Sequence, residues 1–385
     1  MIKLLYITDF TERYPHEFIR GILDYSRQTE RFIIYKMPVT LFKSVGTRKV
    51  AFWARQRKIH VVIGRFDCDA DIPPFRQEGL VVFSQGFRHD LPGIANIVTD
   101  NYLVGRMAAE HFMAQDFRNF AYIGYRNAYW SVERLRGFRD HIRRTTPEQL
   151  IHLYENQDLT NRLDYDAKAI GDWLLSLPKP VSLFCCDDNE AMVVQDVCEM
   201  VGLLCPIDVA ILGVDNDELI CTMTTPPISS IQIDIHRGGL AVADQASRLV
   251  HDPESLPRDV ILKPLNLVSR LSSMAISSSD QLVLRTIHFV LGHIEQRINV
   301  KDLLKALPIS RRPLEIRFRK ATGQSLYQYI LTKRLEYFKQ LLEETDLTIG
   351  AIAARMSEDD PKALSRRFKQ IFGISPDDFR KRESN

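Results

Sequence analysis

The last hundred residues of this 385-residue chain contain an internal repeat. Shifting residues 310–329 by fifty positions matches apolar residues with apolar residues and glycine with glycine. The matched pairs are Leu314 and Leu364, Phe318 and Phe368, Gly323 and Gly373, Ser325 and Ser375, and Tyr329 and Phe379. A fixed offset of this kind indicates one supersecondary unit that is used twice.

Each copy has the pattern of two short helices joined by a tight turn. Apolar-periodic segments at 300–307 and 349–356 precede the two copies. The second helix of each copy is predicted to start at the N-caps Ser310 and Asp360, and to stop at the glycine that follows. This pattern predicts two helix-turn-helix units.

The exposed faces of the two second helices predict a DNA-reading surface. The Leu/Phe pair fixes the buried side of each helix, so the side chains that can reach base edges and phosphates lie opposite. They are Arg311, Arg312, Glu315, Ile316 and Arg319 in the first unit, and Lys362, Ser365, Arg366 and Lys369 in the second. Residues 326–344 between the units predict one helix about 29 Å long. Two recognition helices at that separation would meet successive major grooves, which are roughly 34 Å apart.

Charge is distributed unevenly along an otherwise ordinary globular composition. The chain is 45% hydrophobic and 26% charged, which argues against disorder over most of it. Its length predicts two or three domains. The net charge is +2, but residues 301–385 carry 18 Lys/Arg and 12 Asp/Glu, so this segment is +6 and the rest −4. A basic C-terminal domain on a slightly acidic body is expected of a nucleic-acid binder with a separate sensor.

The sequence predicts a cytosolic protein without a catalytic site, cofactor or metal. Residues 1–9 have the pattern of a strand rather than of an export leader, and no apolar run reaches the roughly 18 residues that span a bilayer. The six cysteines lack CxxC spacing and are interpreted as reduced core residues rather than as disulfides or zinc ligands. No nucleotide-binding or hydrolase motif is present in the sequence.

From residue 1 to about residue 265, buried strands alternate with amphipathic helices. Continuous apolar strands separated by helices indicate parallel sheets covered on both faces. The strands are too many for one open sheet of this length, so two α/β lobes are predicted. Residues 271–284, which include a serine-rich stretch, are predicted to be a linker between a domain at 1–270 and a domain at 285–385.

Polar side chains follow several of the predicted strands. Because ligands of such sheets bind beyond the carboxyl ends of the strands, these residues are candidates for a shared cleft. They are Asp9, Ser84 with Gln85, Asp187 with Asp188, and Asp215 with Asn216. Their oxygen and nitrogen atoms suit the hydroxyl groups of a sugar. The alternative for each is a cap on the following helix.

Six segments of residues 1–270 resemble the LacI-type sugar-binding domains. They are VTDNYLVGRMAAEHF (98–112), FAYIG (120–124), ERLRGF (133–138), LFCCDDNEAM (183–192), AILGVDNDEL (210–219) and PPISSIQ (226–232). The resemblance implies a two-lobed, periplasmic-binding-protein-like module that closes on a small ligand. It also implies that Arg134 hydrogen-bonds a sugar hydroxyl, that Asp215 is the ligand-binding aspartate, and that Asp187 contacts the ligand. A surface ion pair with Glu133 or Asp140 is the alternative for Arg134.

Residues 285–382 resemble the AraC-type DNA-binding domain. The segments that carry the resemblance are ISRRPLEIRFRKATG (309–323), KRLE (333–336) and LSRRFKQIFGISPDDFR (364–380). The turn before the second recognition helix departs from the family: Ser357 and Glu358 replace the usual Gly-Phe, and two further acids follow. Pro308 stands in the first turn where a small residue is common. The first unit is therefore expected to contribute more base readout than the second.

Together, the two resemblances imply a sugar-responsive, sequence-specific transcription regulator of carbohydrate genes. The expected effector is a pentose such as xylose, and activation is expected rather than repression. The expected partners are double-stranded DNA, the sugar, a second copy of the chain and RNA polymerase. A different sugar in the same architecture, or a sugar-binding protein without a regulatory role, are the alternatives.

Overall fold

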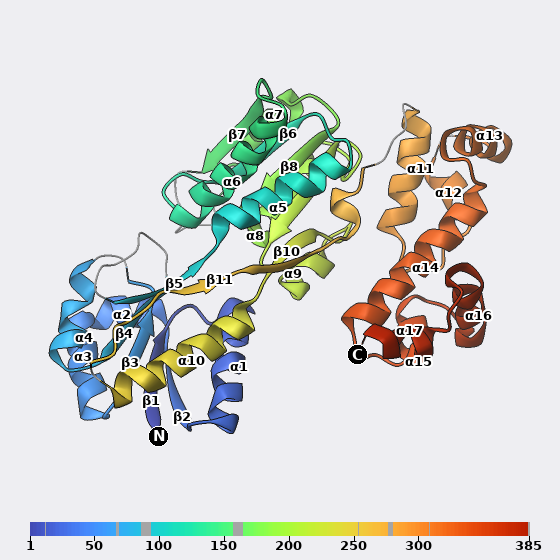
Figure 1. Cartoon of the computed structure of the whole chain (residues 1–385). Coiled ribbons are helices and arrows are strands. Elements are labelled where there is room, and N and C mark those ends of the chain that lie inside the picture. The colour runs from blue at the N-terminus through green and yellow to red at the C-terminus, as the bar shows by residue number, and fades with distance from the viewer. Residues whose placement is uncertain are drawn as a thin grey trace. The chain divides into compact units, whose positions relative to one another are not determined.

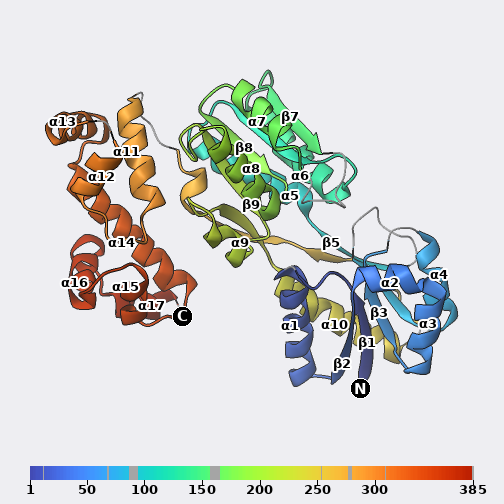
Figure 2. The same cartoon turned by 180° about the vertical axis from the view of Figure 1, so that it is seen from behind.

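The computed structural model describes residues 1–11, 13–66, 69–85, 94–156, 165–252, 254–275, 280–307 and 309–383. Two compact units form: the first comprises Met1–Leu203 with Asp208–Met274, and the second contains Ala275–Asn385. The first unit consists of two α/β lobes and the second is entirely helical (Figures 1 and 2). Within the described ranges, no helix is long and apolar enough to cross a bilayer.

The first lobe has a six-stranded parallel sheet in the order β11-β5-β4-β3-β1-β2. Its strands are β1 (Ile2–Ile7), β2 (Phe32–Met37), β3 (Val61–Gly64), β4 (Val81–Gln85), β5 (Ala95–Thr99) and β11 (Val260–Leu262). Its helices are α1 (Arg13–Gln28), α2 (Val39–Val45), α3 (Thr47–Gln56), η1 (Asp69–Asp71), α4 (Pro73–Gln77) and α10 (Ile235–His251). The four inner strands are apolar and largely buried, as helices on both faces of a parallel sheet require, whereas the edge strands β2 and β11 are partly exposed.

The second lobe repeats the arrangement in the order β12-β10-β9-β8-β6-β7, with only β12 antiparallel to its neighbour. Its strands are β6 (Phe120–Tyr125), β7 (Ile151–Asn156), β8 (Val181–Cys185), β9 (Val209–Val214), β10 (Ser229–Ile233) and β12 (Pro264–Val268). Its helices are α5 (Asn101–Ala114), α6 (Tyr129–Thr145), α7 (Ala167–Ser176), α8 (Asp188–Met200), α9 (Glu218–Met223) and η2 (Leu271–Ser273).

The chain crosses between the lobes three times, after β5, after β10 and between β11 and β12. The crossings are hydrogen-bonded to one another, since the amide of Asp100 donates to the carbonyl of Leu262 at 2.8 Å and that of Asp234 to Lys263 at 3.0 Å. Asp100 and Asp234 also cap α5 and α10 with their side chains. A hinge of three short connections therefore joins two preformed lobes.

Close packing of α5 against α6 fixes the helix that carries Arg134. A Cβ atom on Gly105 would lie 1.9 Å from the Arg134 carbonyl oxygen, and one on Gly137 would lie 2.0 Å from the Tyr102 carbonyl oxygen. Only glycine permits this approach. Both glycines lie in the segments that resemble the LacI-type domains, and their backbone role explains their presence there.

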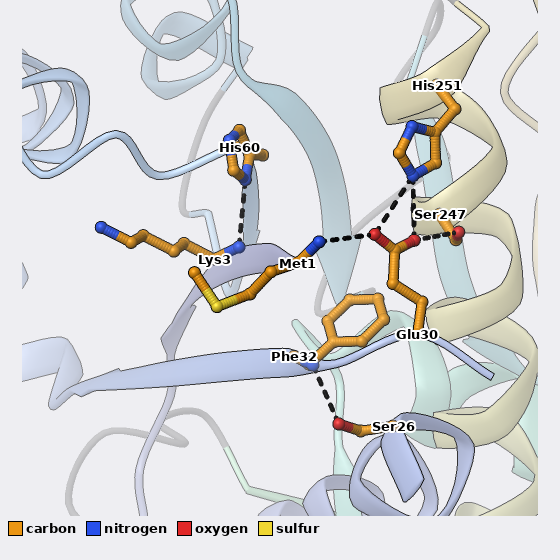
Figure 3. Close-up of polar contacts among 8 residues, drawn as sticks. All are labelled: Met1, Lys3, Ser26, Glu30, Phe32, His60, Ser247 and His251. Atoms are coloured by element: carbon orange, nitrogen blue, oxygen red, sulfur yellow. Dashed lines mark hydrogen bonds and ion pairs between the residues drawn. The ribbon is translucent and has the colours of Figure 1, made fainter. Parts of the chain in front are cut away.

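A polar cluster ties the chain start to α10 in the first lobe (Figure 3). The Glu30 carboxylate accepts hydrogen bonds from the Met1 amine at 2.9 Å and from Ser247 at 2.7 Å, and it contacts His251 at 3.0 Å. Burial alone would raise the pKa of Glu30, but these hydrogen bonds outweigh it and lower the pKa to about 2.

We expect replacement of Glu30 by Gln to remove pH-dependent stability from the sensor. The folded-state pKa lies below the unfolded value of about 4.3. The stabilisation, on the order of 2 kcal/mol, is therefore complete above about pH 4.5 and is lost as the pH falls toward 2. Urea unfolding at several pH values measures the difference between wild type and variant. Glu199→Gln, at an exposed site on α8, is the matched control; a pH-independent difference for Glu30→Gln would contradict the prediction.

The second unit contains seven helices in its described part. They are α11 (Gln281–Gly292), α12 (Val300–Ala306), α13 (Arg311–Thr322), α14 (Leu326–Glu344), α15 (Ile349–Arg355), α16 (Pro361–Phe372) and α17 (Pro376–Glu383). Helix α14 runs through the unit, with α13 toward one end and α16 toward the other (Figures 1 and 2). The observed bounds of α14 are those that the sequence predicts.

The fifty-residue repeat is present in three dimensions. Gly323 and Gly373 both end their helices in the left-handed conformation at φ +76°. The Phe318 and Tyr329 rings pack edge-to-face with centroids 5.2 Å apart, and the equivalent Phe368 and Phe379 rings do so at 5.9 Å. One difference from the prediction concerns the first copy: Ser310 occupies the N-cap position without a side-chain hydrogen bond, whereas Asp360 caps α16 with its carboxylate.

Several elements differ from the sequence-based expectation. Helices α2, α4 and α9 and strands β11 and β12 are short elements that no pattern described above specifies. Within the predicted linker at 271–284, Leu271–Ser273 is a turn whose two serines are fully buried, and α11 begins at Gln281. Five of the six cysteines are buried, and Cys68 lies outside the described residues.

Candidate functional site

Arg134 is a buried guanidinium at the centre of the candidate cleft. Its side chain is 5% exposed and projects from α6, whose backbone packs closely against α5. Nε donates to Asn101 at 3.0 Å, and Nη1 donates to the Cys186 carbonyl. Nη2 lies 3.5 Å from Asp215 Oδ1, and the guanidinium carbon lies 5.0 Å from the Trp130 ring centroid. The alternative of a surface ion pair is excluded, because Glu133 pairs instead with Arg136 at 2.7 Å.

Residues 215–217, here called the Asp215 loop, follow β9 in an unusual backbone conformation. Asp215 and Asn216 have φ of +99° and +48°, values that non-glycine residues adopt at a cost of order 1–3 kcal/mol each. The loop is held by the Ser230 hydroxyl, which accepts from the Asn216 amide at 2.9 Å, and by Asp188, which accepts from the Asp217 amide at 2.8 Å. The 38% exposed side chain of Asp215 is thus presented beside Arg134.

Asp188 is a structural carboxylate beneath the loop. It is 2% exposed, and its second oxygen accepts from the Ser230 hydroxyl at 2.6 Å. Burial raises its pKa well above the usual value, and the nearby Asp215 carboxylate raises it further.

The first lobe reaches the same loop with two side chains. Arg13, in the first turn of α1, donates to the Asn216 carbonyl of the second lobe. Burial raises the pKa of Tyr14. Gln85, at the end of β4, and Arg65 lower this pKa, and the Asp215 carboxylate raises it again. The sequence placed pocket residues within 10–14 but could not assign their roles, because α1 carries no motif that marks individual residues there.

The last segment of the sensor is also bonded to the Asp215 loop. Arg270 is 4% exposed; its Nη2 donates to Asn216 Oδ1 at 2.8 Å, and its Nη1 donates to the Ile228 carbonyl at 2.8 Å. Two residues later, the Ser272 hydroxyl donates to the Ile211 carbonyl at 2.6 Å. Asn216 therefore links the first lobe, the candidate cleft and the segment that continues into the helical unit.

The other predicted ligand residues lie at strand ends but in different roles. Asp9 is exposed and accepts hydrogen bonds from the Thr11 amide and hydroxyl. Asp187 is 4% exposed and accepts from the Glu190 amide at 2.8 Å, which caps α8. Ser84 is 5% exposed near the end of β4. Arg134 and Asp215 are thus brought into contact, while sugar contacts of Asp9, Ser84 and Asp187 stay predictions. Residues 87–90, whose role the sequence left open, lie outside the described residues.

The cleft residues suit a neutral polyhydroxyl ligand. Arg134 offers a rigid fork of donors, Asp215 a carboxylate acceptor, and Trp130 an aromatic face at the same place. A guanidinium and a carboxylate side by side can hold adjacent hydroxyl groups through charge-assisted hydrogen bonds. Their opposite charges compensate each other, so a charged ligand has no advantage there.

The predicted DNA-reading residues lie on the accessible faces of α13 and α16. Leu314, Phe318, Leu364 and Phe368 are buried, as predicted. Exposed predicted residues are Arg311, Arg312, Ile316, Arg319, Lys362, Arg366 and Lys369. Glu315 and Ser365 are half-buried: Glu315 accepts from the Leu326 amide at 3.4 Å, and Ser365 donates to the Pro361 carbonyl at 2.9 Å.

The acidic turn before α16 is held by cations and by the helix start. Glu358 contacts the buried Arg334 of α14 at 3.2 Å, and Asp359 contacts Arg297 at 2.7 Å. Asp360 accepts from the Lys362 and Ala363 amides. The carboxylates thus have partners within the unit, which reduces the repulsion toward DNA that the sequence alone suggests. Pro308 of the first turn lies outside the described residues.

Comparisons with known proteins agree with both parts of the chain. Residues 109–273 match the family described as a periplasmic binding protein-like domain, and residues 303–382 match a helix-turn-helix domain. The xylose operon regulatory protein of Haemophilus influenzae is 27% identical over 294 residues, which cover 75% of each chain. The protein of the same name from Escherichia coli (strain K12) is 27% identical over 320 residues, covering 81% of this chain and 79% of the relative.

A solved structure of the xylose-binding transcription activator XylR superposes with a TM-score of 0.79 at 22% identity. The match covers 98% of this chain and 97% of that structure, so the fold is shared from end to end. The relatives named above are regulators, and the chain is classed with them rather than with enzymes. The chain therefore joins a periplasmic-binding-protein-like domain to a helix-turn-helix domain, and over three quarters or more of its length it is similar to transcription regulators, the xylose operon regulatory proteins.

Proposed function

We propose that the chain is a D-xylose-responsive activator of carbohydrate-utilisation genes. The single observation that carries this proposal is the contact between Arg134 and Asp215 in a sensor fused to two helix-turn-helix units. The name shared by the two relatives favours xylose among the sugars. Another sugar in the same cleft is the competing proposal, because the Arg134 and Asp215 pair suits the hydroxyls of any aldose.

We infer that the proposed ligand residues act from both sides of the cleft. Arg134 and Asp215 would hold adjacent sugar hydroxyls, and Trp130 would cover an apolar face of the ring. Asp9, Ser84 and Asp187 would contribute further polar contacts where the strands end. Arg13 and Tyr14, which lie close to the Asp215 loop from the first lobe, support closure of the lobes around the sugar.

Control of DNA binding would follow from a population shift. The sugar can favour one state only by binding it more tightly than the other. Asn216 bonds with Arg13 on one side and with Arg270 on the other, so a change in lobe closure alters the bonds of the sensor's last segment. Because residues after Arg270 lead into the DNA-binding unit, this route would couple the cleft to the output.

The active form would be a homodimer that presents four helix-turn-helix units to double-stranded DNA and contacts RNA polymerase. It would act in the cytoplasm, where the DNA lies. The proposed organisation keeps a ligand-binding domain at 1–270, a linker at 271–284 and a DNA-binding domain at 285–385. Its proposed DNA contacts are the exposed residues of α13 and α16, with Glu315 and Ser365 as secondary contacts because their side chains also bond within the unit.

A two-step experiment tests the function. A thermal-shift screen against aldopentoses, ketoses and hexoses would identify the effector, and D-xylose is expected to raise the melting temperature most. A duplex selected from a random-sequence library with the wild-type protein would then be titrated with and without D-xylose. Equal affinity for that duplex in both conditions would refute a sugar-responsive regulator.

We predict that replacement of Arg312 by Ala relaxes sequence preference at one half-site. Arg312 is exposed in the first turn of α13, where side chains reach base edges. If it pairs with guanine, the loss is about 1–3 kcal/mol of discrimination at that base pair. Footprinting on single-base variants of the selected duplex measures it. An unchanged order of affinities would remove Arg312 from the reading residues.

A further inference from the structure

The helical unit contains a groove of about 530 Å³ that is lined by both helix-turn-helix units. Its walls come from the start of α12, from α13, from one face of α14 and from α16. Six of its lining side chains are charged: Arg297, Lys301, Arg311, Arg334 and Arg367 are cationic, and Glu358 is the one carboxylate among the described lining residues. We call this site the cation groove.

The positive charge of the groove is only partly compensated. Glu358 is engaged by Arg334, which is 6% exposed and also donates to the Met356 carbonyl at 2.8 Å. In the described chain, no carboxylate pairs with Lys301 or Arg367. Burial lowers the pKa of Arg334, Glu358 raises it, and the charges of Arg297 and Arg367 lower it further, so the cations lie close together. A site that gathers like charges in this way favours an anion.

Apolar side chains of α14 also line the groove. Ile330, Leu331 and the 59% exposed Tyr327 are among them. Guanidinium and ammonium donors beside apolar side chains match a sugar-phosphate chain, whose phosphate oxygens accept hydrogen bonds and whose sugar rings make van der Waals contacts.

The groove lies where the DNA backbone would pass in the proposed complex. If α13 and α16 enter successive major grooves, the sugar-phosphate chains that separate those grooves cross the protein between the two helices. Arg311 of α13 and Arg367 of α16 both line the cation groove, which therefore lies between the two helices. We propose that the cation groove binds the DNA backbone between the two major-groove contacts, as a sequence-independent third contact. This inference rests on the proposed DNA-binding function and adds a contact to it.

Salt dependence of DNA affinity tests the proposal with full-length protein. The variants are Arg367→Gln and Lys301→Gln, measured on a 30-base-pair duplex of mixed sequence. The logarithm of the association constant falls linearly with the logarithm of the salt concentration. Each lost phosphate contact makes this slope less negative by about 0.9 and weakens binding about fivefold at 0.15 M salt. The base preferences measured on the selected duplex are expected to stay unchanged, in contrast to Arg312→Ala.

Lys339→Ala is the matched control. It removes one cation from the far part of α14, where Lys339 lies 5.2 Å from the Phe379 ring centroid and outside the groove. The control is expected to keep the wild-type slope. Melting curves identify a variant that fails to fold. Arg367 is half-exposed and Lys301 is exposed, so the proposal is tested at two independent positions.

Three results overturn the inference. If both groove variants kept the wild-type salt dependence, the groove would make no backbone contact, and the proposed function would still stand. Reduced transcription at unchanged DNA affinity would assign the groove to an acidic protein partner instead. Altered base preference would make Arg367 or Lys301 a reader of sequence. Absence of DNA binding by the wild type would refute the proposed function itself, together with this extension of it.

Discussion

Replacement of Asp215 by Ala should weaken D-xylose binding by about 10- to 150-fold. Asp215 is 38% exposed and lies 3.5 Å from the buried Arg134, so its carboxylate is available to a ligand in the cleft. A hydrogen bond to a charged group contributes about 1.5–3 kcal/mol, which corresponds to this loss of affinity. Isothermal titration calorimetry measures the dissociation constant directly.

Two variants make the Asp215 result specific. Asp166→Asn alters a carboxylate that caps α7 away from the cleft, and it should leave sugar affinity unchanged. Arg134→Lys keeps the charge but loses the fork that bonds Asn101 and the Cys186 carbonyl, and it should weaken binding comparably to Asp215→Ala. Unaltered sugar affinity in Asp215→Ala would remove Asp215 from the site.

Replacement of Arg270 by Lys should uncouple DNA binding from the sugar while sparing sugar binding. Lysine keeps the charge but cannot bond Asn216 and the Ile228 carbonyl together. Effector coupling is commonly 5- to 150-fold, and the ratio of DNA affinities with and without D-xylose should fall toward one. Sugar affinity should change by no more than about threefold, because Arg270 lies behind the Asp215 loop.

The control for Arg270 is Ser272→Ala. It removes the bond to the Ile211 carbonyl from the same segment but does not touch Asn216. It should cost stability while retaining the sugar response. Asn216→Ala should reproduce the Arg270→Lys phenotype, and the double variant should lose no further coupling. A wild-type sugar response in Arg270→Lys would show that the cleft signals by another route.

The helical unit was predicted closely because its structure is determined by local sequence patterns. Helix α14 spans 326–344 in both prediction and structure, and Gly323 and Gly373 adopt the left-handed stops that the repeat requires. The Ser310 cap was predicted but makes no side-chain hydrogen bond, since the sequence cannot give a rotamer. The partners of the acidic turn before α16 could not be predicted for a similar reason. Its partners Arg334 and Arg297 are 24 and 62 residues away from the carboxylates that they contact.

The candidate cleft was predicted only in part. Arg134 and Asp215 were predicted by their resemblance to family motifs, but their contact depends on a separation of 81 residues along the chain. Arg13 and Tyr14 lie in a helix whose pattern marks only its buried face. Strand β11 has three residues and exists through its pairing with β5. Such short segments carry no periodicity of their own, so pairing decides their conformation.

The sequence by itself determined the alternation of buried strands and helices, the two units and the residue types at the strand ends, because hydrophobic periodicity and capping act within a few residues. Tertiary structure alone decided what those residues do. It placed two strained residues at the Asp215 loop, bonded Asn216 to Arg270 across 54 residues, and buried two serines of a polar stretch that the sequence presents as a linker. The physical reason is that burial and long-range hydrogen bonds depend on which surfaces the folded lobes bring together.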